Sequence, residues 1–191
     1  MANDDYTKLQ GFMNMNDGWA ATKNTDTKGD GFTVTTVTRT HEKVPLSKST
    51  IVLENVDVAK FAEAYLGSYD KDPDASEYKL VEKDDTSAVH YLRYKVPIPF
   101  VSDRDMLIKG TASDVPEGTF IFVGSTEHAD KPEVKKVVRI KFWLGGLLVQ
   151  DGSNAKFTVC QYSDAQQKML NSFDPEDIIN DMKNAFKMMK K

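Results

Sequence analysis

The stretch "YKVPIPFVSDRDMLIKG", Tyr94–Gly110, decides the fold of this chain. An alternating, strand-like pattern runs into Pro97 and Pro99, which cannot donate hydrogen bonds to a sheet. A charged cluster, Ser102–Asp105, follows, and an apolar run resumes at Met106. The pattern therefore predicts two neighbouring strands joined by a stiff apolar loop. That loop is either an ordinary connection or the lip of something that opens.

Strand-like and helical segments surround this stretch in a definite order. Thr-, Val- and aromatic-rich segments predict strands, and apolar residues at helical spacing predict helices, one of them capped by Asp57 and the last by Asp174 before Pro175. Helices are expected over 3–15, over 58–69 and from 175 to the end of the chain. Strands are expected over 18–25, 32–41, 49–56, 78–83, 88–96, 104–113, 119–128, 137–150 and 155–163.

This order predicts an α+β fold. Runs of strands joined by short turns favour one curved, meandering antiparallel sheet of about nine strands. The last helix repeats apolar residues on one face and has to bury that face on the sheet. A curved sheet gripping a long C-terminal helix can enclose an internal hydrophobic cavity. We expect residues 1–191 to form a single domain of this kind.

The composition excludes several classes of protein. The net charge of −4 argues against binding to nucleic acid. No apolar run reaches the roughly 18 residues of a membrane-spanning helix, and the acidic start "MANDDYTKLQ" is unlike a signal peptide. The single cysteine, Cys160, fits a reducing compartment. We expect a cytoplasmic protein that acts as a monomer.

Catalytic and cofactor motifs are not apparent. His41, His90 and His128 are widely spaced, without the pattern of a metal site, and no glycine-rich phosphate loop occurs. Cys160 lies in the middle of a predicted strand with no basic neighbour, so packing is its expected role. The sequence predicts a binding protein, with no metal, cofactor or enzymatic activity.

The order of elements and four landmarks resemble the START family of lipid-transfer domains, which have the helix-grip fold. The landmarks are a Pro-rich loop before Arg-Asp at 97–105, Gly18-Trp19, "GSTEHADKPEVKKVVRI" at 124–140, and Gly145-Gly146 in the following strand. The resemblance covers roughly residues 3–190. It implies a domain that binds one lipid in its interior and transfers it between membranes, with the lipid and, transiently, a membrane surface as its partners.

The chain departs from the family pattern at the places that recognise headgroups. Asp70 stands where the phosphatidylcholine-binding relatives have an arginine. His90 and Gly110 stand where the cholesterol-binding relatives have an acid and an arginine. The Pro-rich loop has one extra residue, and the glycines that usually precede the last helix are missing. The resemblance therefore leaves the ligand, a phospholipid, a sterol or a related molecule, open.

Candidate cavity residues follow from the alternation of side chains along strands, together with the register of the family. His90 is either a hydrogen-bonded core histidine or a contact for a lipid headgroup or sterol hydroxyl, and Gln161 offers a similar choice. The residues expected to face the cavity are His90, Leu92, Tyr94, Met106, Ile108, Phe120, Phe122, Ile140, Phe142, Gln161, Ile178, Met182 and Phe186.

The Pro-rich loop is interpreted as a gate. Pro97, Ile98, Pro99, Phe100 and Val101 form this gate loop, whose apolar side chains suit a membrane interface. Arg104 and Asp105 are expected to form an ion pair that anchors its end.

Two other functions stay open at this point. One is an enzyme on a helix-grip scaffold, for which His90 and Tyr94 offer the only acid/base pair in the cavity. The other is a module that senses a lipid without transferring it.

Overall fold

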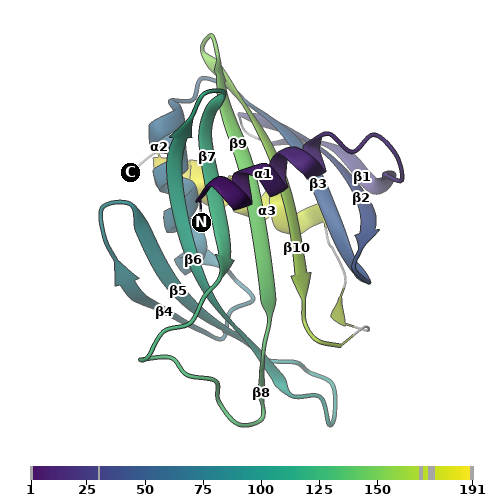
Figure 1. Ribbon diagram of the computed structural model, residues 1–191, viewed down its shortest axis with the longest axis vertical. Coiled ribbons are helices and arrows are strands. Elements are labelled where there is room, and N and C mark those ends of the chain that lie inside the picture. Colours follow the sequence, from purple (N-terminus) through teal and green to yellow (C-terminus); the bar gives the residue numbers. More distant parts are fainter. Residues whose placement is uncertain (1, 30, 168–169, 172–174, 190–191) are drawn as a thin grey trace.

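The computed structural model describes residues 2–29, 31–167, 170–171 and 175–189 (Figure 1). The helices are α1 (Ala2–Met13), α2 (Val58–Gly67), the short 3₁₀ helix η1 (Ser68–Lys71) and α3 (Pro175–Met189). The strands are β1 (Ala20–Gly29), β2 (Phe32–His41), β3 (Val44–Leu53), β4 (Glu77–Lys83), β5 (Ser87–Tyr94), β6 (Asp103–Val115), β7 (Gly118–Ser125), β8 (Val137–Arg139), β9 (Lys141–Asp151) and β10 (Asn154–Asp164).

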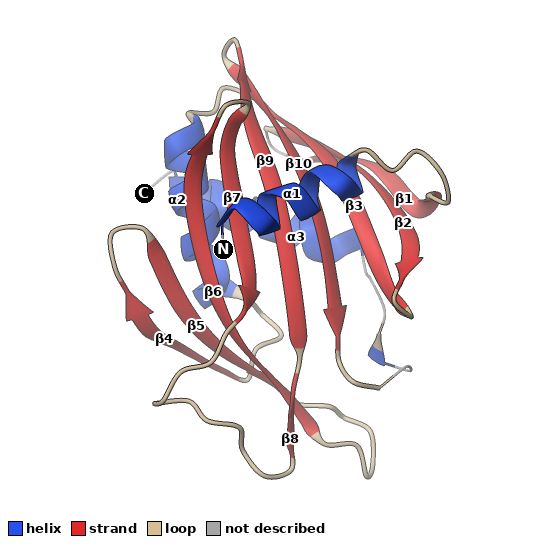
Figure 2. Cartoon of the chain, viewed as in Figure 1, coloured by secondary structure: helices blue, strands red, loops and turns tan. Residues whose placement is uncertain are grey.

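One curved sheet contains all of these strands. Nine follow the order β1-β2-β3-β10-β9-β7-β6-β5-β4 through antiparallel neighbours (Figure 2). The sheet is not a single meander as expected, because β3 pairs with β10 over the register from Leu53↔Ala155 to Leu46↔Tyr162. That pairing joins two meanders, one from each half of the chain, into a single surface.

The segment 137–150, expected to be one strand, is divided at Ile140. The three residues of β8 pair with β6 in parallel, and β9 then crosses to pair with β7 and β10. The amide of Ile140 donates to the carbonyl of Asp105 at 2.8 Å, which fixes the turn between the two strands. The described residues thus form ten strands instead of about nine.

Helices cover both faces of the sheet. Figure 1 shows α1 lying across the front of the central strands, with α2 and α3 behind them. On the outer face, Leu9 and Phe12 of α1 are buried in a cluster with Trp143 of β9. On the inner face, the larger cluster joins the sheet to α2 and α3.

Helices α2 and α3 begin at the residues that the sequence predicts, Val58 and Pro175. Asp57 caps α2, because its side chain accepts a hydrogen bond from the amide of Lys60 at 2.9 Å. Asp174, the expected cap of α3, lies outside the described residues. The helix itself starts at Pro175, with Glu176 and Asp177 in its first turn, where the helix dipole favours acids.

The two glycines in the middle of β9 allow close packing on both faces. A side chain at Gly146 would collide with the ring of Phe157 on the inner face. One at Gly145 would lie 2.9 Å from Trp143 and 3.3 Å from Leu9 on the outer face. The Gly-Gly landmark is therefore a consequence of burial on both sides of the strand.

We expect Gly146→Ala to lower the free energy of unfolding by about 1–3 kcal/mol, because the fully buried Phe157 cannot move away freely. Gly11→Ala is the matched control, since nothing lies within 4 Å of a side chain added there and alanine favours the helix. Urea unfolding of both variants measures the difference. Equal stabilities would contradict this account of β9.

Candidate functional site

A hollow of about 320 Å³ lies between the inner face of the sheet and α3. Its sheet wall is mainly apolar and includes Met106, Ile140, Phe142 and Leu144. The opposite side, which we call the polar wall, comes from η1, the loop after it and α3. Its residues include Ser68, Tyr69, Asp72, Asp74, Asp177, Asn180, Asp181 and Asn184.

Five of the predicted cavity residues meet at this hollow. Tyr94 is the last residue of β5, Met106 lies near the start of β6, Ile140 and Phe142 flank the start of β9, and Gln161 is on β10. They come from neighbouring parts of the sheet, and their side chains point to the same face because side chains alternate along a strand.

Other predicted residues lie in the packed core instead. Leu92, Ile108, Ile178 and Met182 have no exposed surface and belong to the inner cluster. Phe186 packs against the same cluster, with its ring centroid 5.6 Å from that of Phe32. Side chains therefore fill much of the space between sheet and helices, and the hollow occupies one end of it.

The prediction for Phe120 and Phe122 is wrong. Both belong to the cluster beneath α1, on the outer face of β7, where Phe120 lies 5.2 Å from the ring of Tyr6. Their neighbours Ile121 and Val123 face inward instead. Both faces of β7 carry apolar side chains because both faces are buried, the outer one beneath α1.

His90 faces a different space from the other candidates. It borders an open groove of about 760 Å³ between α2 and strands β4–β6, with Tyr78 and Leu66 among its neighbours. Its Nδ1 atom lies 3.1 Å from the hydroxyl of Tyr78, while Nε2 has no partner among the described residues. Burial lowers the pKa of His90 to about 4, so the ring is neutral at neutral pH.

The acid/base pair considered for an enzyme is not formed. His90 is hydrogen-bonded to Tyr78, and the Tyr94 hydroxyl donates to Asp72 at 2.8 Å. Burial, with the Asp72 charge as a second cause, raises the pKa of Tyr94 far above its usual range. Tyr94 therefore stays protonated and acts as a hydrogen-bond donor.

Carboxylates in the polar wall are candidate site residues that the sequence analysis did not include. Burial raises the pKa of Asp181 to about 8, and the nearby charges of Asp177 and Asp72 add to the effect. Asp177, Asn180, Asp181 and Asn184 follow helical spacing along one side of α3. This polar stripe is a pattern in the sequence itself, beside the apolar stripe of the same helix.

The gate loop leaves the sheet beside this hollow, although none of its five residues belongs to the described wall. Phe100 is fully exposed and has a positive φ of 65°. The amide of Val101 donates to the carbonyl of Ile98 at 3.1 Å, which closes a turn. At the base of the loop, Arg93 and Asp103 form an ion pair at 2.8 Å.

The expected ion pair between Arg104 and Asp105 is not formed. Adjacent residues of a strand point to opposite faces, so each finds a different partner. Arg104 donates to the carbonyl of Ala165 at 2.9 Å and to Gln167 at 2.8 Å. Asp105 accepts two hydrogen bonds from Arg139, at 2.7 and 3.0 Å. These contacts tie β6 to the segment after β10 and to β8.

No protein-family model and no curated protein sequence matches the chain. Solved structures do match it. Human STARD10 superposes with a TM-score of 0.66 at 18% identity, over 98% of this chain and 79% of that one. A STAR-related lipid transfer protein fragment from Xanthomonas axonopodis gives 0.68 at 20% identity, over 92% and 100%. Human StAR-related lipid transfer protein 5 gives 0.62 at 12% identity, over 100% and 93%.

The chain has the START-like helix-grip fold, as the sequence predicted. Within the described residues, no helix is both long and apolar enough to span a membrane. Nor do His, Cys, Asp and Glu side chains gather in the described regions into a group that would hold a metal ion.

The raised pKa of Asp181 makes stability depend on pH. Between about pH 4 and pH 8 the folded protein holds a proton on Asp181 that the unfolded chain has lost. The contribution of this group to stability is therefore complete below about pH 4 and is lost as the pH rises toward 8.

We expect Asp181→Asn to reduce the fall in the free energy of unfolding between about pH 5 and pH 8 by more than about 1 kcal/mol. Urea unfolding at the two pH values measures the change. Asp151→Asn, at the exposed turn between β9 and β10, is the control and should retain the pH dependence of the parent protein. Identical profiles for all three proteins would show that Asp181 ionises normally.

Proposed function

We propose that this protein binds one lipid molecule in the hollow beside α3 and carries it between membranes. The observation that carries the proposal is the position of the hollow, next to the strand ends joined by the gate loop, with Phe100 fully exposed on that loop. The lipid-transfer names of the proteins that share the fold support the same function. A cytoplasmic carrier of this kind meets membranes only transiently.

The two walls of the hollow suit an amphiphilic ligand. The apolar sheet wall replaces the bilayer as a solvent for a hydrocarbon chain, at about 0.8 kcal/mol per buried methylene. The polar wall faces it with hydroxyl, amide and carboxyl groups that satisfy a polar head. A volume of about 320 Å³ lies at the small end of the range of ligand pockets and corresponds to one small molecule or part of a larger one.

Loading and release require this space to open. In the proposed mechanism the gate loop and α3 move apart at the membrane, and Ile98, Phe100 and Val101 enter the interface. The Arg93–Asp103 ion pair keeps the two ends of the loop together while its tip moves. The protein thus contributes a solvent and a gate, and no covalent chemistry is involved.

We expect the double variant Phe100→Asp, Val101→Asp to slow lipid transfer between liposomes at least about tenfold, because charged side chains oppose insertion into the interface. Transfer of a fluorescent lipid from donor to acceptor vesicles measures the rate. Val52→Asp is the control, since Val52 is 42% exposed on β3, outside the gate. Unchanged transfer by the loop variant, with the fold intact by circular dichroism, would refute the gate.

Native mass spectrometry of protein purified from cells tests lipid binding itself. A co-purified lipid at one copy per chain is expected. A protein that holds lipid but fails to move it between vesicles would be the lipid-sensing module considered above. Protein that never acquires lipid, from cells or from vesicles, would overturn the proposed function.

A further inference from the structure

Two turns meet at one end of the sheet. β6 and β8 pair in parallel, beginning with Asp103↔Val137, so the chain reaches both strands from the same direction. The residues just before them, 100–102 and 134–136, therefore lead into neighbouring strand starts. Figure 1 shows both loops at the lower end of the molecule.

The two turns are built alike. The amide of Val101 donates to the carbonyl of Ile98 at 3.1 Å, and that of Val137 donates to the carbonyl of Val134 at 3.0 Å. Each turn also contains one residue with a positive φ, Phe100 at 65° and Lys136 at 66°. Both are thus tight, hydrogen-bonded turns.

Each turn exposes one large apolar side chain. Phe100 is fully exposed and Val134 is 48% exposed, and each stands three residues before the first β6–β8 pair. The other exposed large apolar side chains in the described part of the chain, Val52 and Leu80, lie on strands β3 and β4. Two of the four exposed large apolar side chains among the described residues thus lie in these two turns.

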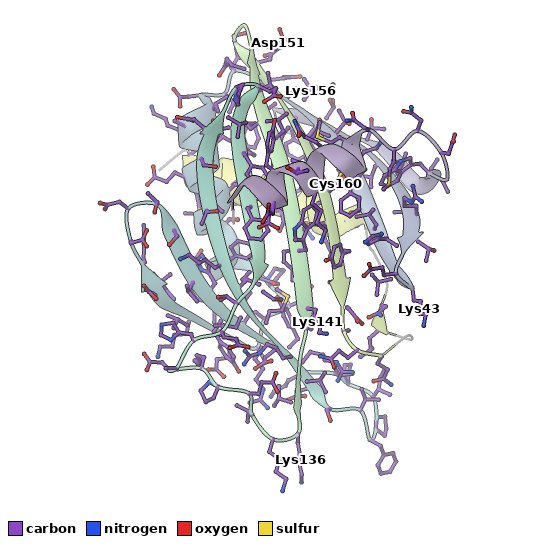
Figure 3. All side chains as sticks on the ribbon, in the orientation of Figure 1. Lys43, Lys136, Lys141, Asp151, Lys156 and Cys160 are labelled. Atoms are coloured by element: carbon purple, nitrogen blue, oxygen red, sulfur yellow. The ribbon has the colours of Figure 1, made fainter. Side chains whose placement is uncertain are left out.

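The charges around these side chains are mainly positive. We call residues 95–102 and 133–137 together the tip. Lys95, Lys135 and Lys136 are exposed there, and Glu133 is the only acid in the two segments. The chain as a whole carries a net charge of −4, so the tip is a positive region on a negatively charged protein. In Figure 3, Lys136 extends from the lowest point of the molecule.

We propose that the tip is a docking surface for a bilayer that contains anionic lipids, with Phe100 and Val134 inserted and the lysines over the headgroups. The inference rests on the proposed function and adds to it a second loop and a preference for membrane charge. Two convex turns with single apolar side chains fit a deformable surface. Single apolar side chains on two tight turns give little of the apolar area that a folded protein partner buries.

Matched charge reversals test the electrostatic part. Lys136→Glu and Lys156→Glu change the net charge equally, but the two residues lie at opposite ends of the molecule (Figure 3). Binding is measured by co-sedimentation with vesicles of phosphatidylcholine alone or with about one third phosphatidylserine. We expect Lys136→Glu to weaken binding to the anionic vesicles at least about tenfold, and Lys156→Glu to leave it within about twofold. Equal effects of the two reversals would overturn the proposal.

A fluorescent probe tests insertion of the second turn. An environment-sensitive maleimide is attached to Val134→Cys or, as the control, to Val52→Cys. Burial raises the pKa of Cys160 to about 12, which keeps the native thiol unreactive. We expect the emission at position 134 to rise and shift to the blue on anionic vesicles, while that at position 52 stays unchanged. A water-like spectrum at position 134 on protein that has bound the vesicles would overturn the proposal.

The outcomes separate this inference from lipid carriage. A protein that transfers lipid while position 134 stays in water keeps the proposed function and loses the two-turn tip. A protein whose position 134 inserts but which never acquires lipid keeps the docking surface and loses carriage.

Discussion

Burial of the central sheet on both faces is the constraint on which the rest of the structure depends. With α1 on one face and α2 and α3 on the other, each central strand must present apolar or small residues in both directions. The Gly145-Gly146 pair meets this requirement at the most crowded point, with Trp143 on one side and Phe157 on the other. The β3–β10 ladder joins the two meanders into one sheet, and the hollow lies between that sheet and α3.

Burial on both faces also explains which elements and inward-facing residues could be predicted from the sequence. Helical periodicity placed α2 and α3, and alternation placed Tyr94, Met106 and Phe142 on the inner face, because in these elements one face is clearly distinguished from the other. In β7 the alternation is lost, since Phe120 and Ile121 are both apolar and both buried. The register of the family put Phe120 on the inner face, whereas it lies on the outer one. Only the position of α1 resolves such a case.

Contacts between segments that are distant along the chain could not be predicted from the sequence, for a different reason. The partner of Asp105 is Arg139, and the residues bound by Arg104 follow β10, so both interactions depend on tertiary structure. The polar wall likewise needs the loop after η1 to face α3. The pKa of Asp181 is raised mainly by its burial, and then by the charges of Asp177 and of Asp72 in the loop after η1. Local patterns can nominate such residues, whereas their chemistry arises from neighbours that the chain brings together on folding.

The tilted contact between the rings of Tyr69 and His90 has a consequence for the capacity of the interior. Tyr69 borders the hollow, His90 borders the groove, and their ring centroids are 5.1 Å apart. The two spaces are therefore partitioned by a pair of aromatic rings. Rotation of one side chain between staggered rotamers changes such a partition without any movement of the backbone. The space open to the proposed lipid is thus set by a side-chain torsion as well as by the fold.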